Sequence, residues 1–146
     1  MRDFRYPAKF AADKVYGGFT VTFRDLPEAI TQGDDLAAAL SQAADCLDEA
    51  IAGRLARLDG IPAASKPAKG EYLIAVPPLM AAKAALQLAM SAAGVSNVEL
   101  AKRIGCDEKE VRRMLDPKHQ TKIASIHRAL RSLGQALSIS VISDAA

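Results

Sequence analysis

The sequence contains no tryptophan, two cysteines and two histidines among its 146 residues. Cys46 and Cys106 are far apart, and neither has a second cysteine or histidine at the spacing of metal ligands. The sequence therefore indicates neither a zinc site nor a disulfide framework, and reduced thiols are the simpler interpretation. We expect no bound metal and no cofactor.

A long uncharged apolar run is also lacking. Residues 1–10 alternate apolar and polar side chains instead of placing a basic segment before an apolar one. Pro77 and Pro78 interrupt the most apolar stretch further on. The sequence thus predicts no signal peptide and no membrane span, and we expect a cytoplasmic protein without a membrane partner.

Catalytic constellations are missing as well. Neither His119 nor His127 has a nucleophile and base arranged around it, and Gly17-Gly18 lacks the surroundings of a phosphate-binding loop. Metal-dependent hydrolysis needs paired carboxylates, but none of the acids near the expected strands lies inside a strand beside another. Those acids are Asp3, Asp13, Asp25 and Glu28. We therefore expect a protein that is not an enzyme.

Charge is distributed unevenly along the chain. Residues 1–70 contain nine Lys/Arg and ten Asp/Glu, whereas residues 71–146 contain ten and seven. Half of the residues are apolar and a quarter are charged, which is typical of one globular domain or two very small ones. The basic excess in the second half favours nucleic-acid binding.

The first 77 residues show the alternation of short strands. Apolar side chains occupy the even positions from Phe4 to Phe10, and Pro7 among them predicts an edge or locally irregular strand. Residues 19–23 alternate again after a glycine pair that suits a hairpin. Residues 29–31 and 72–76 predict two further short strands.

A longer segment between these strands has the period of a helix. An apolar stripe predicts a helix that begins near Asp34-Asp35 and ends at Gly60. The stripe consists of Leu36, Leu40, Ala44, Leu47, Ile51, Leu55 and Leu58. We therefore expect an α+β fold, with this helix covering one face of a small antiparallel sheet.

After an alanine-rich helix at residues 79–93, two helix starts follow closely. Ser96 with Glu99, and Asp107 with Glu110, have the spacing of capping boxes. Between them, Gly105 can adopt the left-handed conformation of a sharp turn. The spacing of Ala101, Gly105 and Val111 is that of a helix-turn-helix.

The second of these helices would turn a charged face outward. Val111, Met114 and Leu115 are expected inside, and a third helix is expected at residues 122–133. The side chains expected to reach DNA bases and phosphates are Glu108, Lys109, Arg112 and Arg113, with Lys118, His119 and Lys122 just beyond. The alternative is a solvated helix face on a purely structural three-helix bundle.

These motifs resemble the HicB antitoxins of bacterial HicA–HicB toxin-antitoxin systems. The resemblance begins at Tyr6-Pro7-Ala8, continues through residues 18–34 and resumes at the helix-turn-helix. Its specific part is the Phe-x-Asp-Leu-Pro-Glu-Ala-x-Thr-Gln-Gly stretch from Phe23 to Gly33. Some HicB proteins carry a ribbon-helix-helix in place of the helix-turn-helix. The spacing of Ala101, Gly105 and Val111 indicates that this chain resembles the helix-turn-helix branch of the family.

The resemblance implies a two-part antitoxin. Residues 1–77 would form a cut-down RNase-H-like domain without its catalytic carboxylates, which binds and blocks a small RNA-cleaving HicA-type toxin. Residues 78–146 would form the helix-turn-helix domain that represses the protein's own operon by binding operator DNA, usually as a dimer or larger assembly. A stand-alone regulator with a ligand-sensing N-terminal domain is the alternative.

Two interfaces are hypotheses at this point. Asp45, Asp48 and Glu49 lie largely off the apolar stripe of the long helix and would attract a basic toxin. A merely solvated helix face explains each of them equally well. Residues 137–142 alternate apolar and small polar side chains, which predicts a C-terminal strand that pairs with its copy in a second chain.

Overall fold

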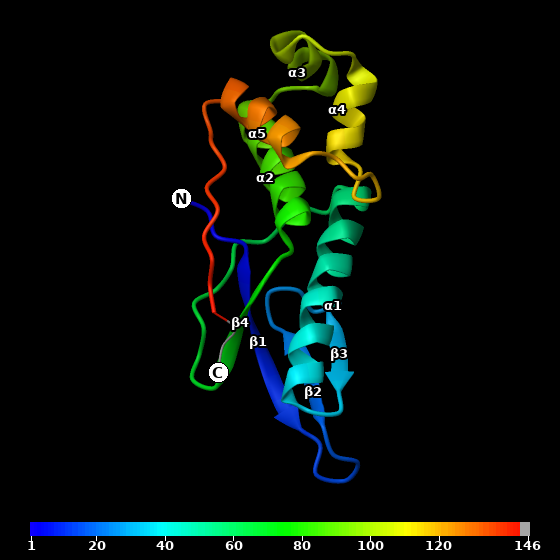
Figure 1. Ribbon diagram of the computed structural model, residues 1–146, viewed down its shortest axis with the longest axis vertical. Helices are drawn as coiled ribbons and strands as arrows, with labels where there is room; N and C mark the ends of the chain where they lie inside the picture. Colours follow the sequence, from blue (N-terminus) through cyan, green and yellow to red (C-terminus); the bar gives the residue numbers. More distant parts are fainter. Residues whose placement is uncertain (144–146) are drawn as a thin grey trace. The chain divides into compact units, whose positions relative to one another are not determined.

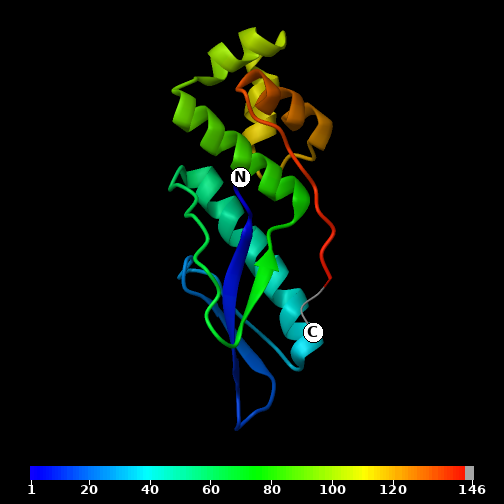
Figure 2. The same cartoon turned by 90° about the vertical axis from the view of Figure 1, so that its left-hand side faces the viewer.

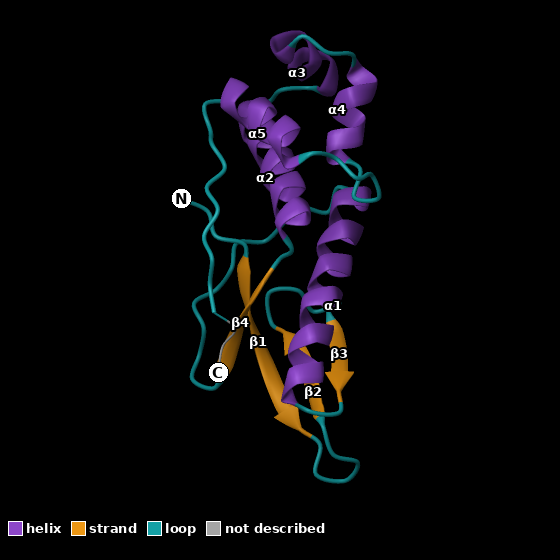
Figure 3. Ribbon diagram, in the orientation of Figure 1, coloured by secondary structure: helices purple, strands orange, loops and turns teal. Residues whose placement is uncertain are grey.

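The computed structural model describes residues 1–143, and all four strands lie within the first 75 of them (Figure 1, Figure 3). The elements are β1 (Arg5–Ala12), β2 (Phe19–Phe23), β3 (Ile30–Gly33), α1 (Leu36–Arg57), β4 (Glu71–Ala75), α2 (Pro78–Ala93), α3 (Asn97–Ile104), α4 (Glu108–Leu115) and α5 (Ile123–Ser132). A small antiparallel sheet, a long helix and a helical C-terminal part confirm the expected α+β class. The likeness to a cut-down RNase H domain stays a prediction.

Contacts divide the chain into two units. The first contains residues 1–51 and 62–77, together with Ser143. The second contains residues 52–61 and 78–142. The sheet lies in the first unit, and α2 to α5 lie in the second.

The sheet has the strand order β3-β2-β1-β4, with every neighbouring pair antiparallel. β1 as a whole is an inner strand, because it pairs with both β2 and β4. At Pro7 itself only β4 is a partner, so the expected edge holds for this end of the strand and not for β1 as a whole. The Phe4 carbonyl accepts a hydrogen bond from Val76 on the β4 side, at 2.8 Å. Alternate residues point their backbone groups to opposite sides, so the Pro7 nitrogen faces β2. Pairing with β2 begins only at Ala8, opposite Phe23, and the missing N–H costs no ladder bond.

One face of the sheet forms the core of the first unit against α1 (Figure 1, Figure 2). The alternation of β2 confirms the period-two interpretation, since Val21 and Phe23 are buried while Thr20 and Thr22 are exposed. In β1, Tyr6 and Ala8 are buried as expected, but Pro7, which was expected on the opposite face, is buried as well. Phe10 packs edge-on against Tyr72 of β4, with ring centroids 4.9 Å apart.

The buried stripe of α1 is only partly the expected one. Leu47, Ile51 and Leu55 are buried, but Leu58 is 78% exposed. The helix ends at Arg57, and a positive φ of 58° at Leu58 turns the chain out of the helix. Near the start of α1, the fully buried positions are Ala39 and Ala43, whereas Leu36, Leu40 and Ala44 are half-buried.

Small residues are needed there because the backbones approach closely. A Cβ added to Gly33, at the end of β3, would lie 2.3 Å from the Ala39 nitrogen and 2.5 Å from its Cα. Asp35 begins the helix as expected, since its Oδ1 accepts from the Ala38 N–H at 2.7 Å. The first turn of α1 thus packs directly on the end of the sheet.

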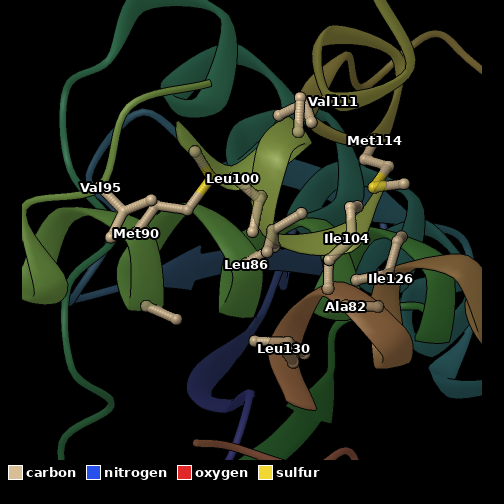
Figure 4. Packing of buried hydrophobic residues seen from close by; sticks show 13 residues of the cluster. Ala82, Leu86, Met90, Val95, Leu100, Ile104, Val111, Met114, Ile126 and Leu130 are labelled. Carbon is tan, nitrogen blue, oxygen red and sulfur yellow. The ribbon is translucent and has the colours of Figure 1, made fainter. Parts of the chain in front are cut away.

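The second unit has its own apolar core, which α2, α3, α4 and α5 share (Figure 4). Its fully buried large side chains are Leu86, Leu100, Val111, Ile126 and Leu130. Val111 and Met114 face inward as expected, with Leu115 half-buried beside them. In the described chain, no single helix has the length and hydropathy to cross a membrane, and α2 and α3 pass that test only as a pair with a 104° bend between them.

The segment after α5 has no regular structure within residues 135–143. The Leu137 N–H donates to His127 Nδ1 at 3.1 Å, and Ile139 and Val141 beyond it are exposed. The strand expected at residues 137–142 is therefore not formed within a single chain. Its pairing with a second copy stays a prediction.

Candidate nucleic-acid interface

Helices α3 and α4 begin at side-chain caps, as the sequence predicts. Ser96 Oγ accepts from the Glu99 N–H at 3.2 Å, and Asp107 Oδ1 accepts from the Glu110 N–H at 2.9 Å. Both caps have extended backbone, which is the usual N-cap conformation. Each cap satisfies one amide that the first helical turn leaves free, so the N-terminal end of each short helix is defined.

A tight turn at Gly105 joins the two helices. Gly105 has a left-handed φ of 71°, and its N–H donates to the Ala101 carbonyl. The Arg128 guanidinium of α5 also donates to the Ile104 carbonyl at the end of α3. A cation at the negative end of the helix dipole is stabilising, so α5 helps to hold this turn.

The outward face of α4 is cationic. Lys109, Arg112 and Arg113 lie on the side of the helix opposite to Val111 and Met114, which are buried. Arginine forms paired hydrogen bonds with a guanine edge, and lysine supplies a point charge to phosphate. The expected group of DNA-contacting side chains on α4 therefore shares one exposed surface.

Glutamates within α4 flank these cations and pair with them. Arg112 Nε lies 2.8 Å from Glu108 Oε2, and Arg113 Nη1 lies 2.8 Å from Glu110 Oε1. The two arginine side chains are 62% and 41% exposed. Exposed ion pairs of this kind contribute about 0–1 kcal/mol, so a phosphate or base can replace the glutamate at little cost.

The loop that follows α4 carries the other expected contacts. Lys118 and Lys122 are exposed, and His119 is half-buried. The loop is internally bonded, because Asp116 Oδ1 accepts from the Lys118 N–H at 2.9 Å and its carbonyl accepts from the His119 N–H at 3.1 Å. His119 Nδ1 lies 2.9 Å from Thr121 Oγ1. These residues therefore stand on an ordered loop beside the end of α4.

Sequence reasoning missed a buried lysine behind this surface. Lys83 of α2 is fully buried, and its Nζ donates to the Arg113 and Met114 carbonyls and to Thr121 Oγ1. Burial lowers the pKa of Lys83, and Asp116 opposes that shift. The sequence does contain a sign of this buried lysine. Lys83 interrupts the apolar stripe that Met80, Leu86 and Met90 form at helical spacing.

The acidic residues of α1 form a surface in the first unit. Asp45 and Glu49 are exposed and Asp48 is half-buried, roughly opposite to the buried Ala43 and Leu47. Burial raises the pKa of Asp48, and the charges of Asp45 and Glu49 raise it further. Three carboxylates this close disfavour one another and favour a cationic partner.

The acids considered for metal catalysis have structural partners instead. Asp3 pairs with Arg5, and Asp25 binds Ser65. Asp13 accepts from the Val15 and Tyr16 N–H groups, and these bonds lower its pKa. Within residues 1–143, no group of three His, Cys, Asp or Glu side chains is arranged to hold a metal ion.

Both cysteines are free thiols. Burial raises the pKa of Cys46 and of Cys106, and neighbouring carboxylates add to the shift. A raised pKa leaves less thiolate, which is the reactive form. Both thiols are therefore less reactive than an ordinary cysteine.

The sequence matches a known protein family and several known proteins. A family described as "HicB_like antitoxin of bacterial toxin-antitoxin system" matches residues 5–85. "Antitoxin HicB 2" of Photorhabdus laumondii is 38% identical over 97% of this chain and 99% of its own length. "Antitoxin HicB" of Escherichia coli is 35% identical over 86% of this chain and 91% of its own length. "Antitoxin HicB" of Pseudomonas fluorescens is 32% identical, with 86% of each chain covered.

Proposed function

The chain belongs to the HicB-like antitoxin family of bacterial toxin-antitoxin systems, and we propose that it has two binding activities. The first unit binds and neutralises a small RNA-cleaving toxin of the HicA kind. The second unit represses the protein's own operon by placing α4 in the major groove of operator DNA, as a helix-turn-helix does. Neither activity involves a catalytic step, and both belong in the cytoplasm.

The observation that carries the DNA proposal is the position of the three cations on α4. Lys109, Arg112 and Arg113 point away from a core that fixes the opposite side of the helix. Lys118 and Lys122 extend the positive surface along the adjoining loop. Residues 96–134 contain nine Lys/Arg and five Asp/Glu, a balance that favours a phosphate backbone.

Operator binding is tested with the purified chain and a DNA fragment from upstream of its own gene. The double variant Arg112→Ala/Arg113→Ala should raise the Kd at least tenfold, because one good arginine–guanine pair contributes about 1–3 kcal/mol. Lys66→Ala/Lys69→Ala is the matched control, since it removes the same charge from an exposed loop of the first unit. Equal binding of the operator and a shuffled fragment would refute the proposal.

Toxin binding is assigned to the acidic surface of Asp45, Asp48 and Glu49. An RNA-cleaving protein needs a basic surface for its substrate, and complementary charge speeds the encounter between partners. Asp45→Lys/Glu49→Lys should slow association with the toxin at least tenfold at low salt, with a smaller effect at high salt. Glu99→Lys/Glu110→Lys makes the same charge change in the second unit and should leave toxin association unchanged. Undiminished association of the first variant would contradict this assignment.

A homodimer or larger assembly completes the proposal. Ile139 and Val141 are 72% and 98% exposed on an extended segment, which makes that segment suited to pair with its copy in a second chain. Two copies would place two α4 helices on one operator. A chain truncated after Gly134 should become monomeric in sedimentation and lose operator affinity. A truncated chain that stays dimeric would exclude the segment as the dimer contact.

A further inference from the structure

Lys83 joins three parts of the second unit through a single ammonium group. Its Nζ donates to the Arg113 carbonyl at 2.9 Å, to the Met114 carbonyl at 3.1 Å and to Thr121 Oγ1 at 2.8 Å. An ammonium group has three N–H donors, so its donors are matched by these three acceptors. The lysine comes from α2, the two carbonyls from the last turn of α4, and the hydroxyl from the loop before α5.

Thr121 ties the same carbonyl a second time. Its hydroxyl donates to the Arg113 carbonyl at 3.1 Å while its oxygen accepts from Lys83. The last carbonyls of a helix have no partner within the helix and carry its negative dipole end, so a cation there is favourable. The end of α4 and the loop that carries Lys118 and Lys122 are thus fixed to the same charged group.

The core of the second unit does not need a charge at this position. Met80, Leu86 and Met90 continue the same stripe of α2, and an apolar side chain would avoid the desolvation of a buried ammonium. What Lys83 provides, and an apolar residue cannot, is the three hydrogen bonds to α4 and the loop. Those two elements carry the candidate DNA-contacting side chains.

We propose that Lys83 is a positioning residue for DNA binding. It fixes the position of the end of α4 relative to the loop of residues 116–122. Arg112 and Arg113 can then reach bases while Lys118 and Lys122 reach phosphates. The proposal rests on the proposed operator binding. Contacts of this kind depend on the placement of supporting residues to within about 0.5 Å, so loss of the frame lowers affinity in a protein that is still folded.

The test measures operator binding of the full chain across a series of salt concentrations. Lys83→Met keeps the length and apolar character of the stem but removes the three donors. We expect its Kd for the operator to rise at least tenfold. We also expect the slope of log Kd against log salt to become shallower by about one, because each lost phosphate contact lowers that slope. Circular dichroism and thermal unfolding identify a temperature at which the variant is fully folded, and binding is measured at that temperature.

Leu86→Ala is the matched control. It weakens the same helix by a cavity and removes no hydrogen bond to α4 or the loop. A purely structural effect would change the operator Kd of both variants according to their folded fractions and leave the salt slope alone. Both variants should still bind the toxin, because that activity is assigned to the first unit.

Each outcome bears on one proposal. If the wild-type chain binds its operator and folded Lys83→Met retains its Kd and salt slope, the positioning role is refuted. If the wild-type chain shows no preference for the operator, the proposed function fails first. If Lys83→Met does not fold, Thr121→Val tests the same frame, since it removes one acceptor and leaves both carbonyls. A Thr121→Val protein with unchanged Kd and slope would overturn the proposal.

Discussion

Asp25 binds Ser65 through both of its carboxylate oxygens, accepting from the Ser65 N–H at 2.9 Å and from its hydroxyl at 2.5 Å. The adjacent Arg24 donates to the Lys66 carbonyl and pairs with Glu71 at the start of β4. Arg24 and Asp25 lie in the stretch on which the family resemblance depends. Their contacts hold the long loop before β4 against the end of β2, so this part of the motif has a structural role.

Replacing Asp25 should therefore destabilise the first unit. Asp25→Ala removes a partly buried acceptor and leaves the Ser65 N–H and hydroxyl without it, which costs about 1–3 kcal/mol. Urea unfolding followed by circular dichroism measures the loss. Asp34→Ala, at an exposed acid just before α1, is the control and should change stability by less than about 0.5 kcal/mol. Equal stability of the two variants would show that the Asp25–Ser65 contact contributes nothing.

Glu71 should make the protein sensitive to acid. The Ala68 N–H and the Arg24 guanidinium lower the pKa of Glu71 below its ordinary value of 4.5. Because the folded pKa lies below the unfolded one, the stabilisation is complete above about pH 4.5 and is lost as pH falls through the folded value. The difference in unfolding free energy between wild type and Glu71→Gln should be constant from pH 7 to 5 and shrink below 4.5. A difference that stays constant down to pH 3 would contradict this.

Period and capping residues allowed most of the fold to be predicted. The alternation of β2 and the caps at Ser96 and Asp107 are local signals, and the structure confirms them. The position of β1 inside the sheet is not a local property, because one of its partners is β4. Glu71, where β4 begins, lies 59 residues after Ala12, where β1 ends. Likewise, the side of α1 that packs on the sheet depends on the close approach at Gly33, and this approach favours alanines over leucines.

Only the exposed side chains of the candidate site could be predicted from the sequence. Helical spacing placed Lys109, Arg112 and Arg113 on one face of α4, and the structure has them there. The group behind that face was not predicted, since Lys83 lies 30 residues before Arg113 and meets its carbonyl only through the packing of α2 on α4. A charged residue within an apolar stripe was the available signal.

Two glycine substitutions should act in opposite directions. Gly33→Ala would place a Cβ 2.3 Å from a backbone nitrogen of α1, so the sheet and helix must separate, and overpacking of this kind typically costs about 1–3 kcal/mol. Gly53→Ala lies within α1, where alanine is preferred by about 1 kcal/mol and the nearest atom belongs to the flexible Arg57 side chain. Urea midpoints should fall for the first variant and rise for the second. A Gly33→Ala protein of wild-type stability would mean that the close approach is not maintained in solution.

Substitutions at Asp107 can distinguish its role as the N-cap of α4 from the effect of its negative charge. Asp107→Ala removes the acceptor for the Glu110 N–H, so it should lower the unfolding free energy by about 1 kcal/mol and weaken operator binding as the first turn frays. Asp107→Asn keeps an acceptor at the same place and should retain stability. It also removes a negative charge beside a surface proposed to meet phosphates, so its operator affinity should equal or exceed that of the wild type, most clearly at low salt. If both variants bound the operator with equally reduced affinity, the carboxylate itself would be required for binding and its role would not be that of a cap.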